Sequence, residues 1–191
     1  MLTDHSFGGL TTVNTFLTRP NLFQTRFAMS PSLWSNDLEL VSKMVKHLSS
    51  EASTTSFLFM NVAGTKGERM TAPLAKMKPL LEKHSSKCSN WHIDVYEAEG
   101  HMTTPVIGQL SAYRNYLKDW PLPYTEVLKG LDLIVKHADK VSKKYDYEIQ
   151  PNENKTTLGY HLLGEKIVRT PLIPLNKSLS CTLIQRTLMI A

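Results

Sequence analysis

Short apolar runs alternate with segments of helical period along the first two thirds of this chain. Residues 57–63 (FLFMNVA) form a continuous apolar run, which is typical of a strand covered on both faces of a parallel sheet. Residues 23–30 and 91–97 are two further strand candidates. Apolar residues at helical spacing follow each strand in turn: Leu38, Val41, Val45 and Leu48; Met70, Leu74, Met77 and Leu81; Val106, Leu110, Tyr113 and Leu117. This alternation predicts an α/β architecture with a parallel sheet flanked by helices.

Local signals place the starts of two of these helices and a possible break in a third. Asn36, followed three residues later by Glu39, is the pattern of a capping box. Thr104 and Pro105 offer a helix cap and a first-turn proline. Pro79 is expected to kink or shorten the helix over residues 70–81.

Composition and charge exclude several classes of protein. The 191 residues, of which 41% are hydrophobic and 20% charged, suffice for one globular domain with a small appendage. The net charge of +5 is spread along the chain, and the only tight basic group is Lys140, Lys143 and Lys144, which argues against nucleic-acid binding. Cys88 and Cys181 have no metal-binding spacing and are expected to be two reduced thiols rather than a bridge.

The N-terminal residues have no basic start followed by an apolar run, so they do not form a secretory signal. No stretch of about 18 uncharged apolar residues could span a membrane. As written, the chain is therefore expected to be cytoplasmic. If the true N-terminus lies further upstream, a periplasmic location of the full-length parent protein is also open.

The first ten residues carry the most specific chemical signal. Leu2 and Thr3 can only be the end of a strand, and a helical segment follows Gly9, with Ser6 in the sharp turn between them. Strand, turn with a central serine, and helix are the context of a nucleophile elbow, G-x-S-x-G. Gly8 fits the second glycine of that pattern, whereas Asp4 stands where the first glycine belongs and is expected to crowd the turn.

An acid and a histidine each follow a later strand. Residues 57–63 lead into Gly64–Glu68, and residues 91–97 lead into Glu99 and His101. Ligand chemistry collects at the carboxyl ends of strands in open α/β sheets. The order serine, acid, histidine is that of the α/β-hydrolase triad.

Four motifs occur in the order in which one family has them: HSFGGL from His5, SPSLW from Ser30, GTKGE from Gly64 and EGHMTTP from Glu99. In these motifs the chain resembles an esterase family of α/β-hydrolases that includes the enterochelin (ferric-siderophore) esterases and the esterase D-like enzymes. The resemblance covers roughly residues 2–120.

The resemblance implies a serine carboxylic ester hydrolase that acts on a small-molecule ester and needs no metal or other cofactor. It makes Ser6 the nucleophile, His101 the general base and Glu68 the acid that orients His101. The backbone N–H of Phe7 would be one oxyanion donor, and Trp34 would lie near the mouth of the substrate pocket. Glu97 and Glu99 compete with Glu68 as the acid, and Asp94 ranks lower. The other histidines, His5 among them, are expected to be solvated or structural.

The chain departs from this family at its start, where the strands before the elbow and the loop with the second oxyanion donor are absent. It is therefore expected to be the C-terminal part of an α/β-hydrolase fold. Loss of one oxyanion donor costs ~10²–10³ in turnover, so hydrolysis should be slow or absent. The elbow strand becomes a sheet edge that could promote self-association.

We expect three regions: a partial hydrolase domain over residues 1–120, a helical extension over 121–169, and an irregular tail over 170–191. Residues 144–151 and 157–163 resemble the link into a tetratricopeptide-like helical tail. The alternative to an esterase is a non-catalytic fragment, or an interaction module that uses the helices after Trp120.

Overall fold

The computed structural model describes residues 1–49, 55–84 and 90–165. The chain divides into two compact units, Met1–Pro121 and Leu122–Ala191. Each unit is described by itself. The predicted tail over residues 170–191 and both cysteines lie outside the described residues.

The first unit is built on a four-stranded sheet in which every neighbouring pair is parallel. Its strands, in both chain order and sheet order, are β1 (Leu2–His5), β2 (Thr25–Met29), β3 (Phe57–Ala63) and β4 (Trp91–Tyr96). The two inner strands are almost wholly buried, as their apolar runs predict, while β1 and β4 form the edges. The expected α/β fold with a parallel sheet is confirmed.

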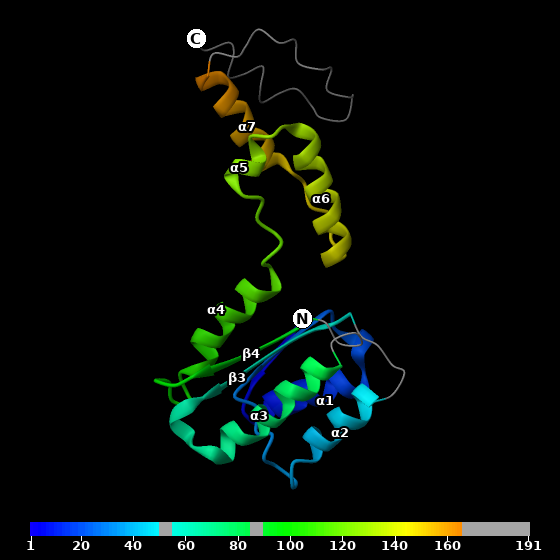
Figure 1. Cartoon of the computed structure of the whole chain (residues 1–191), viewed down its shortest axis with the longest axis vertical. Helices are drawn as coiled ribbons and strands as arrows, with labels where there is room; N and C mark the ends of the chain where they lie inside the picture. The colour runs from blue at the N-terminus through cyan, green and yellow to red at the C-terminus, as the bar shows by residue number, and fades with distance from the viewer. Residues whose placement is uncertain (50–54, 85–89, 166–191) are drawn as a thin grey trace. The chain divides into compact units, whose positions relative to one another are not determined.

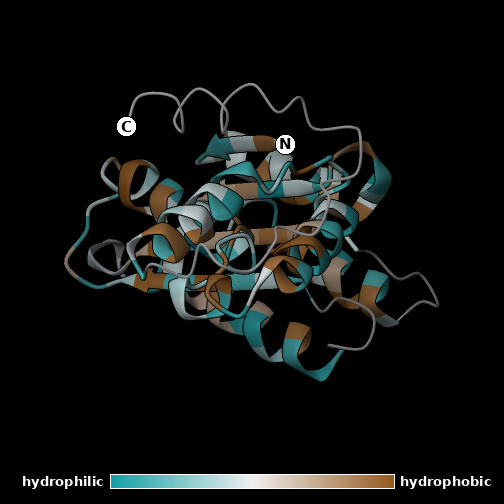
Figure 2. Ribbon diagram, turned by 90° about the horizontal axis from the view of Figure 1, so that it is seen from above, coloured by the Kyte–Doolittle hydropathy of each residue, from teal (hydrophilic) through white to brown (hydrophobic). Residues whose placement is uncertain are grey.

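Helices cover both faces of this sheet (Figure 1). One face carries α1 (Phe7–Thr18), α2 (Glu39–Ser49) and α3 (Glu68–Lys83), and the other carries α4 (Thr104–Tyr116). Short 3₁₀ turns, η1 (Pro20–Leu22) and η2 (Gly64–Lys66), lie in the connections. In Figure 2 brown and teal segments both occur around the helices, as expected when each helix buries only one side.

The larger core lies between the sheet and α1–α3, and a smaller one lies under α4. Met29, Met60 and Met77 are buried in these cores, where a flexible thioether side chain can fill irregular gaps. Helix α3 continues to Lys83 through Pro73 and Pro79, so of the two expected effects of Pro79, a kink or a shorter helix, the shortening does not occur.

The start of α2 also differs from the sequence prediction. Residues 36–38 all have left-handed backbone angles, with φ of 49° at Asn36, 51° at Asp37 and 62° at Leu38, and the helix begins at Glu39. Instead of a capping box, the Asn36 side-chain amide donates to the Glu39 carboxylate at 2.6 Å. Val45, predicted to face the core, is exposed, and Met44 is buried in its place.

Helix α4 buries only part of the apolar stripe predicted for it. Val106 and Leu110 are 76% and 53% exposed, whereas Gly108 and Ala112 are buried. A Cβ on Gly108 would lie 1.8 Å from the Asn61 side-chain nitrogen. Small residues therefore let the first half of α4 approach the sheet closely, whereas Tyr113 from the predicted stripe packs on Phe27 with ring centroids 5.3 Å apart.

The buried Arg26 side chain lies at the C-terminal end of α1. The Arg26 guanidinium donates to the carbonyl oxygens of Phe23 and Arg19, at 2.8 and 2.6 Å, and to the hydroxyls of Thr15 and Ser56. Burial lowers the pKa of Arg26. A cation at the C-terminus of a helix complements the helix dipole and satisfies carbonyls that have no partner within the helix.

The described residues of the second unit, 122–165, form helices joined by short connections, with no strand. The unit contains α5 (Tyr124–Val127), α6 (Leu131–Tyr145) and α7 (Asn152–Gly164), which pack around Val127, Ile134 and Leu158. A tetratricopeptide-like character stays a prediction. Across the described chain, no helix has both the length and the apolarity to cross a bilayer.

Candidate active site

Ser6 lies in a strained turn between β1 and α1. Its backbone angles, φ 58° and ψ −117°, fall in a region that costs a non-glycine residue of order 1–3 kcal/mol. The turn is held because the Ser6 N–H donates to the Met29 carbonyl at 3.0 Å, and the Ser6 carbonyl accepts from the N–H groups of Leu10 and Ser32 at 3.0 and 3.1 Å. The Ser6 hydroxyl does not cap α1; its oxygen lies 3.3 Å from the Ser32 hydroxyl.

Asp4 and Gly8 fit together at this turn. A Cβ on Gly8 would lie 2.1 Å from the Asp4 carboxyl group, so the Asp4 side chain fills the space that Gly8 leaves. One Asp4 oxygen accepts from the His5 backbone N–H at 2.8 Å. Gly8 thus accommodates the aspartate that stands in place of the first glycine of the motif.

His101 lies in the loop between β4 and α4. The rings of His101 and His5 have centroids 4.3 Å apart and are tilted by 41°. The His101 carbonyl lies 2.9 Å from His5 Nε2 and accepts from the Thr104 hydroxyl, also at 2.9 Å. The residue before Ser6 therefore contacts both the ring and the backbone of His101.

Three fully buried polar side chains anchor this loop to the sheet. The Ser30 N–H donates to Asn61 Oδ1 at 2.8 Å, and Asn61 Nδ2 donates to the Thr104 carbonyl at 3.2 Å. The Ser30 and Thr104 hydroxyls lie 2.9 Å apart. Buried polar groups that satisfy one another fix a single arrangement of the chain. The sequence analysis gave none of these three residues this role, although a lone asparagine in the run FLFMNVA was a usable signal.

The three candidate acids lie in the segments that follow β3 and β4. The Thr65 hydroxyl joins these segments by donating to the Glu99 carbonyl at 2.7 Å. Glu68 is exposed as the first residue of α3. Glu97 packs against Gly64, where a Cβ would lie 2.5 Å from its carboxylate. The Glu99 carboxylate accepts from the Thr103 hydroxyl at 2.5 Å.

Phe7, Trp34 and Arg69 form a cluster next to Ser6. The Phe7 and Trp34 rings meet edge to face with centroids 5.9 Å apart, and the Arg69 guanidinium carbon lies 3.8 Å from the centre of the Trp34 ring. A guanidinium so close to an indole face is a cation–π contact. Phe7 is also the first residue of α1, where backbone N–H groups lack a partner within the helix and the helix dipole favours negative charge.

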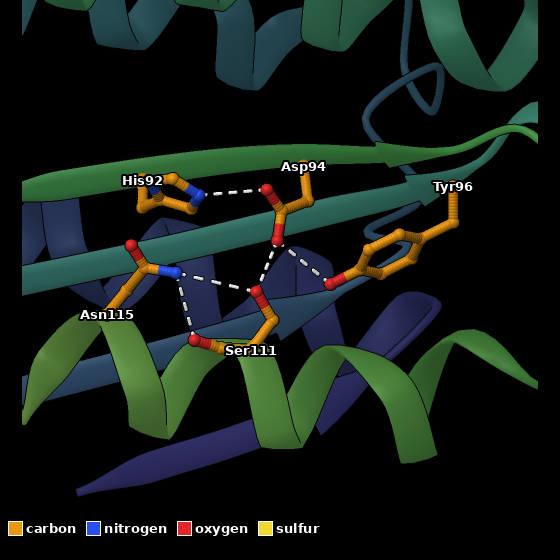
Figure 3. Close-up of polar contacts among 5 residues, drawn as sticks. All are labelled: His92, Asp94, Tyr96, Ser111 and Asn115. Carbon is orange, nitrogen blue, oxygen red and sulfur yellow. Dashed lines mark hydrogen bonds and ion pairs between the residues drawn. The ribbon is translucent and has the colours of Figure 1, made fainter.

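A second polar cluster joins β4 to α4 (Figure 3). The Asp94 carboxylate accepts from His92 Nε2 at 2.8 Å, the Tyr96 hydroxyl at 2.9 Å and the Ser111 hydroxyl at 2.5 Å. Asn115 donates in turn to the Ser111 carbonyl at 3.0 Å. These bonds engage both carboxylate oxygens of Asp94 within the cluster, in keeping with its lower rank as a catalytic acid.

Burial alone would raise the pKa of Asp94, but the hydrogen bonds from Ser111, Tyr96 and His92 outweigh it and lower the pKa. Burial, reinforced by the neighbouring Asp94 carboxylate, raises the pKa of Tyr96 to about 12. The cluster therefore holds an ionised aspartate and a neutral tyrosine at neutral pH. Among the described residues, no group of three or more histidine, cysteine or acidic side chains is arranged to hold a metal ion.

No protein-family model matches this sequence, and no curated protein matches it. Solved structures do match, and three of them are compared with this chain. The siderophore hydrolases EstA and EstB from Aspergillus nidulans are 19% and 22% identical, with TM-scores of 0.45 and 0.39. They match 60% and 63% of this chain and 46% and 50% of their own chains.

The third is an IroE-like serine hydrolase from Shewanella oneidensis, with a TM-score of 0.66 and 19% identity over 87% of this chain. The match covers 54% of the hydrolase, so the chain spans about half its length. Over that match, the chain has the α/β-hydrolase fold expected from its sequence.

Proposed function

We propose that this chain carries the nucleophile and base of a serine carboxylic ester hydrolase. Ser6 is the nucleophile, His101 the general base, Glu68 the acid that orients His101, and the Phe7 N–H an oxyanion donor. The observation that carries the proposal is the contact of His5 with the ring and carbonyl of His101, because it brings the histidine loop beside the serine turn.

The reaction follows from these roles. His101 takes the proton of the Ser6 hydroxyl as its oxygen attacks the acyl carbon, since a serine hydroxyl is a poor nucleophile without a base. The oxyanion that forms lies near the Phe7 N–H at the start of α1. His101 then gives the proton to the leaving alcohol, and a water molecule, activated in the same way, releases the acid and restores Ser6.

Phe7 and Trp34 offer an apolar surface beside Ser6 for the acyl or alcohol part of the ester. A small-molecule ester is the proposed substrate class. Because the chain spans about half of the matched hydrolase, a second oxyanion donor would come from outside the described residues, and turnover by this chain alone should be slow.

The test is hydrolysis of p-nitrophenyl acetate by purified wild-type protein, Ser6→Ala and His101→Ala. The expected result is slow hydrolysis that both substitutions remove. The matched control is Ser35→Ala, a half-buried serine that follows Trp34. Hydrolysis that persists in Ser6→Ala would contradict the proposal.

A further inference from the structure

We infer that His5 is a positioning residue, which sets the place of the His101 imidazole relative to the Ser6 hydroxyl. The inference rests on the proposed function and adds to it a residue whose side chain joins nucleophile and base. His5 is the last residue of β1 and directly precedes Ser6, so the position of the β1 backbone determines the positions of both residues.

The contact with the His101 backbone determines the tautomer of His5. A carbonyl oxygen only accepts hydrogen bonds, so the His5 nitrogen 2.9 Å away, Nε2, carries the proton and donates it. The same carbonyl accepts from the Thr104 hydroxyl. His101 is thus held from β1 through His5 and from β2 and β3 through Thr104, Ser30 and Asn61.

The ring contact restricts the side chain as well as the backbone. With centroids 4.3 Å apart and a tilt of 41°, the His5 ring limits the positions open to the His101 ring. A catalytic group displaced by about 1 Å can lose on the order of 10²-fold in rate. Removing the donor of His5 should therefore reduce the reactivity of Ser6 without touching Ser6 or His101.

Two substitutions separate this role from general stability. His5→Gln keeps an N–H donor at nearly the reach of Nε2, whereas His5→Leu keeps an apolar side chain of similar size and loses the donor. The matched control is His84→Gln, at the opposite end of α3 from Glu68. For each variant we would measure the rate at which a fluorophosphonate labels Ser6, and the imidazole resonances of His101 by NMR.

We expect His5→Gln and the control to label within about threefold of wild type, and His5→Leu to label at least about tenfold more slowly, a fraction of the loss that misplacement can cause. We also expect the His101 resonances to move in His5→Leu and to stay in His5→Gln. Equal labelling in wild type and His5→Leu, or equal losses in the two His5 variants, would overturn the inference.

The two readouts distinguish this inference from the proposed function. If wild-type Ser6 is not labelled at all, the proposed function fails, and the NMR comparison alone decides the role of His5. His101 resonances that move only in His5→Leu then support the positioning role, and resonances unchanged in His5→Leu overturn it.

Discussion

Ser6 keeps a strained backbone conformation because several neighbours fix it. Three backbone hydrogen bonds, to Met29, Leu10 and Ser32, hold the turn, and Gly8 leaves room for Asp4 beneath it. Strain of this kind persists only where the surroundings determine it, and it concentrates at functional sites. The turn presents the serine at the start of α1, next to the loop that carries His101.

The identity of the acid gives a prediction at this scale. We expect Glu68→Gln to reduce kcat by ~10²–10⁴, because the imidazole of His101 then lacks its orienting charge. Glu99→Gln is the matched control and should change kcat only a few-fold, since its carboxylate already accepts from Thr103. Rates of Ser6-dependent hydrolysis measure both, and equal losses would rule out Glu68 as the distinct acid.

A second residue-scale prediction concerns stability at acid pH. The pKa of Asp94 is lowered in the folded protein, so the unfolded chain binds its proton first as pH falls. The stabilisation from Asp94 is thus complete above about pH 4 and is lost below it, towards the folded pKa. Unfolding free energies should show wild type more stable than Asp94→Asn at neutral pH.

The difference in unfolding free energy between wild type and Asp94→Asn should narrow as the pH drops below about 4. Ser49→Ala, an exposed position at the end of α2, is the control and should track wild type at every pH. A difference between wild type and Asp94→Asn that stays constant with pH would contradict the assigned shift.

Sequence motifs indicated Ser6, His101 and the three acids as candidates, since each lies a few residues after a strand in the chain. They could not identify His5, Ser30 or Asn61 as supports of the His101 loop. Those contacts join a strand to a loop or helix that is distant in sequence, such as His5 to His101 and Asn61 to Thr104. The strand order alone would not bring His5 and His101 together either, since β1 and β4 are opposite edges of the sheet; their contact depends on the path of the loop between β4 and α4.

At the scale of elements, sequence patterns found every strand and α-helix of the sheet unit but misplaced the first two residues of the α4 stripe. These patterns assigned Val106 and Leu110 to the core because they are the larger apolar residues. The residues of α4 that are buried against the sheet here are instead Gly108 and Ala112. The buried Asn61 and Met29 side chains occupy the space that a residue larger than Gly108 would need. How closely a helix can approach a sheet depends on the side chains of the sheet. The hydrophobic period of the helical segment alone carries no information about those side chains.

Glycine substitutions test this packing of α4. Gly108→Ala gains about 1 kcal/mol of helix propensity, but its methyl group would overlap Asn61 and Met29, and overpacking costs about 1–3 kcal/mol. We therefore expect a net loss of unfolding free energy, measured in urea. Gly159→Ala in α7 is the matched control, because its added methyl meets no described atom within 4 Å, and it should be neutral or stabilising.

If Gly108→Ala were as stable as its control, the close approach of α4 to the sheet would be wrong. The start of α2 was not predictable from the hydrophobic period either. The three left-handed residues before α2 leave no trace in hydrophobic period.

At the scale of the molecule, the elbow strand β1 is a sheet edge. Its outer backbone groups can pair with another strand, so we expect the purified chain to self-associate. Sedimentation velocity across a range of concentrations should show species larger than the monomer. A monodisperse monomer at every concentration would contradict this expectation.

The central claim, that Ser6 is a nucleophile activated by His101, is tested most directly by covalent labelling with a fluorophosphonate followed by peptide mass mapping. Labelling is stoichiometric, so it registers even a slow nucleophile. The account predicts one adduct, on the peptide that contains Ser6, absent in Ser6→Ala and at least ~10²-fold slower in His101→Ala. An unlabelled protein, or an adduct on another residue that persists in Ser6→Ala, would contradict the account.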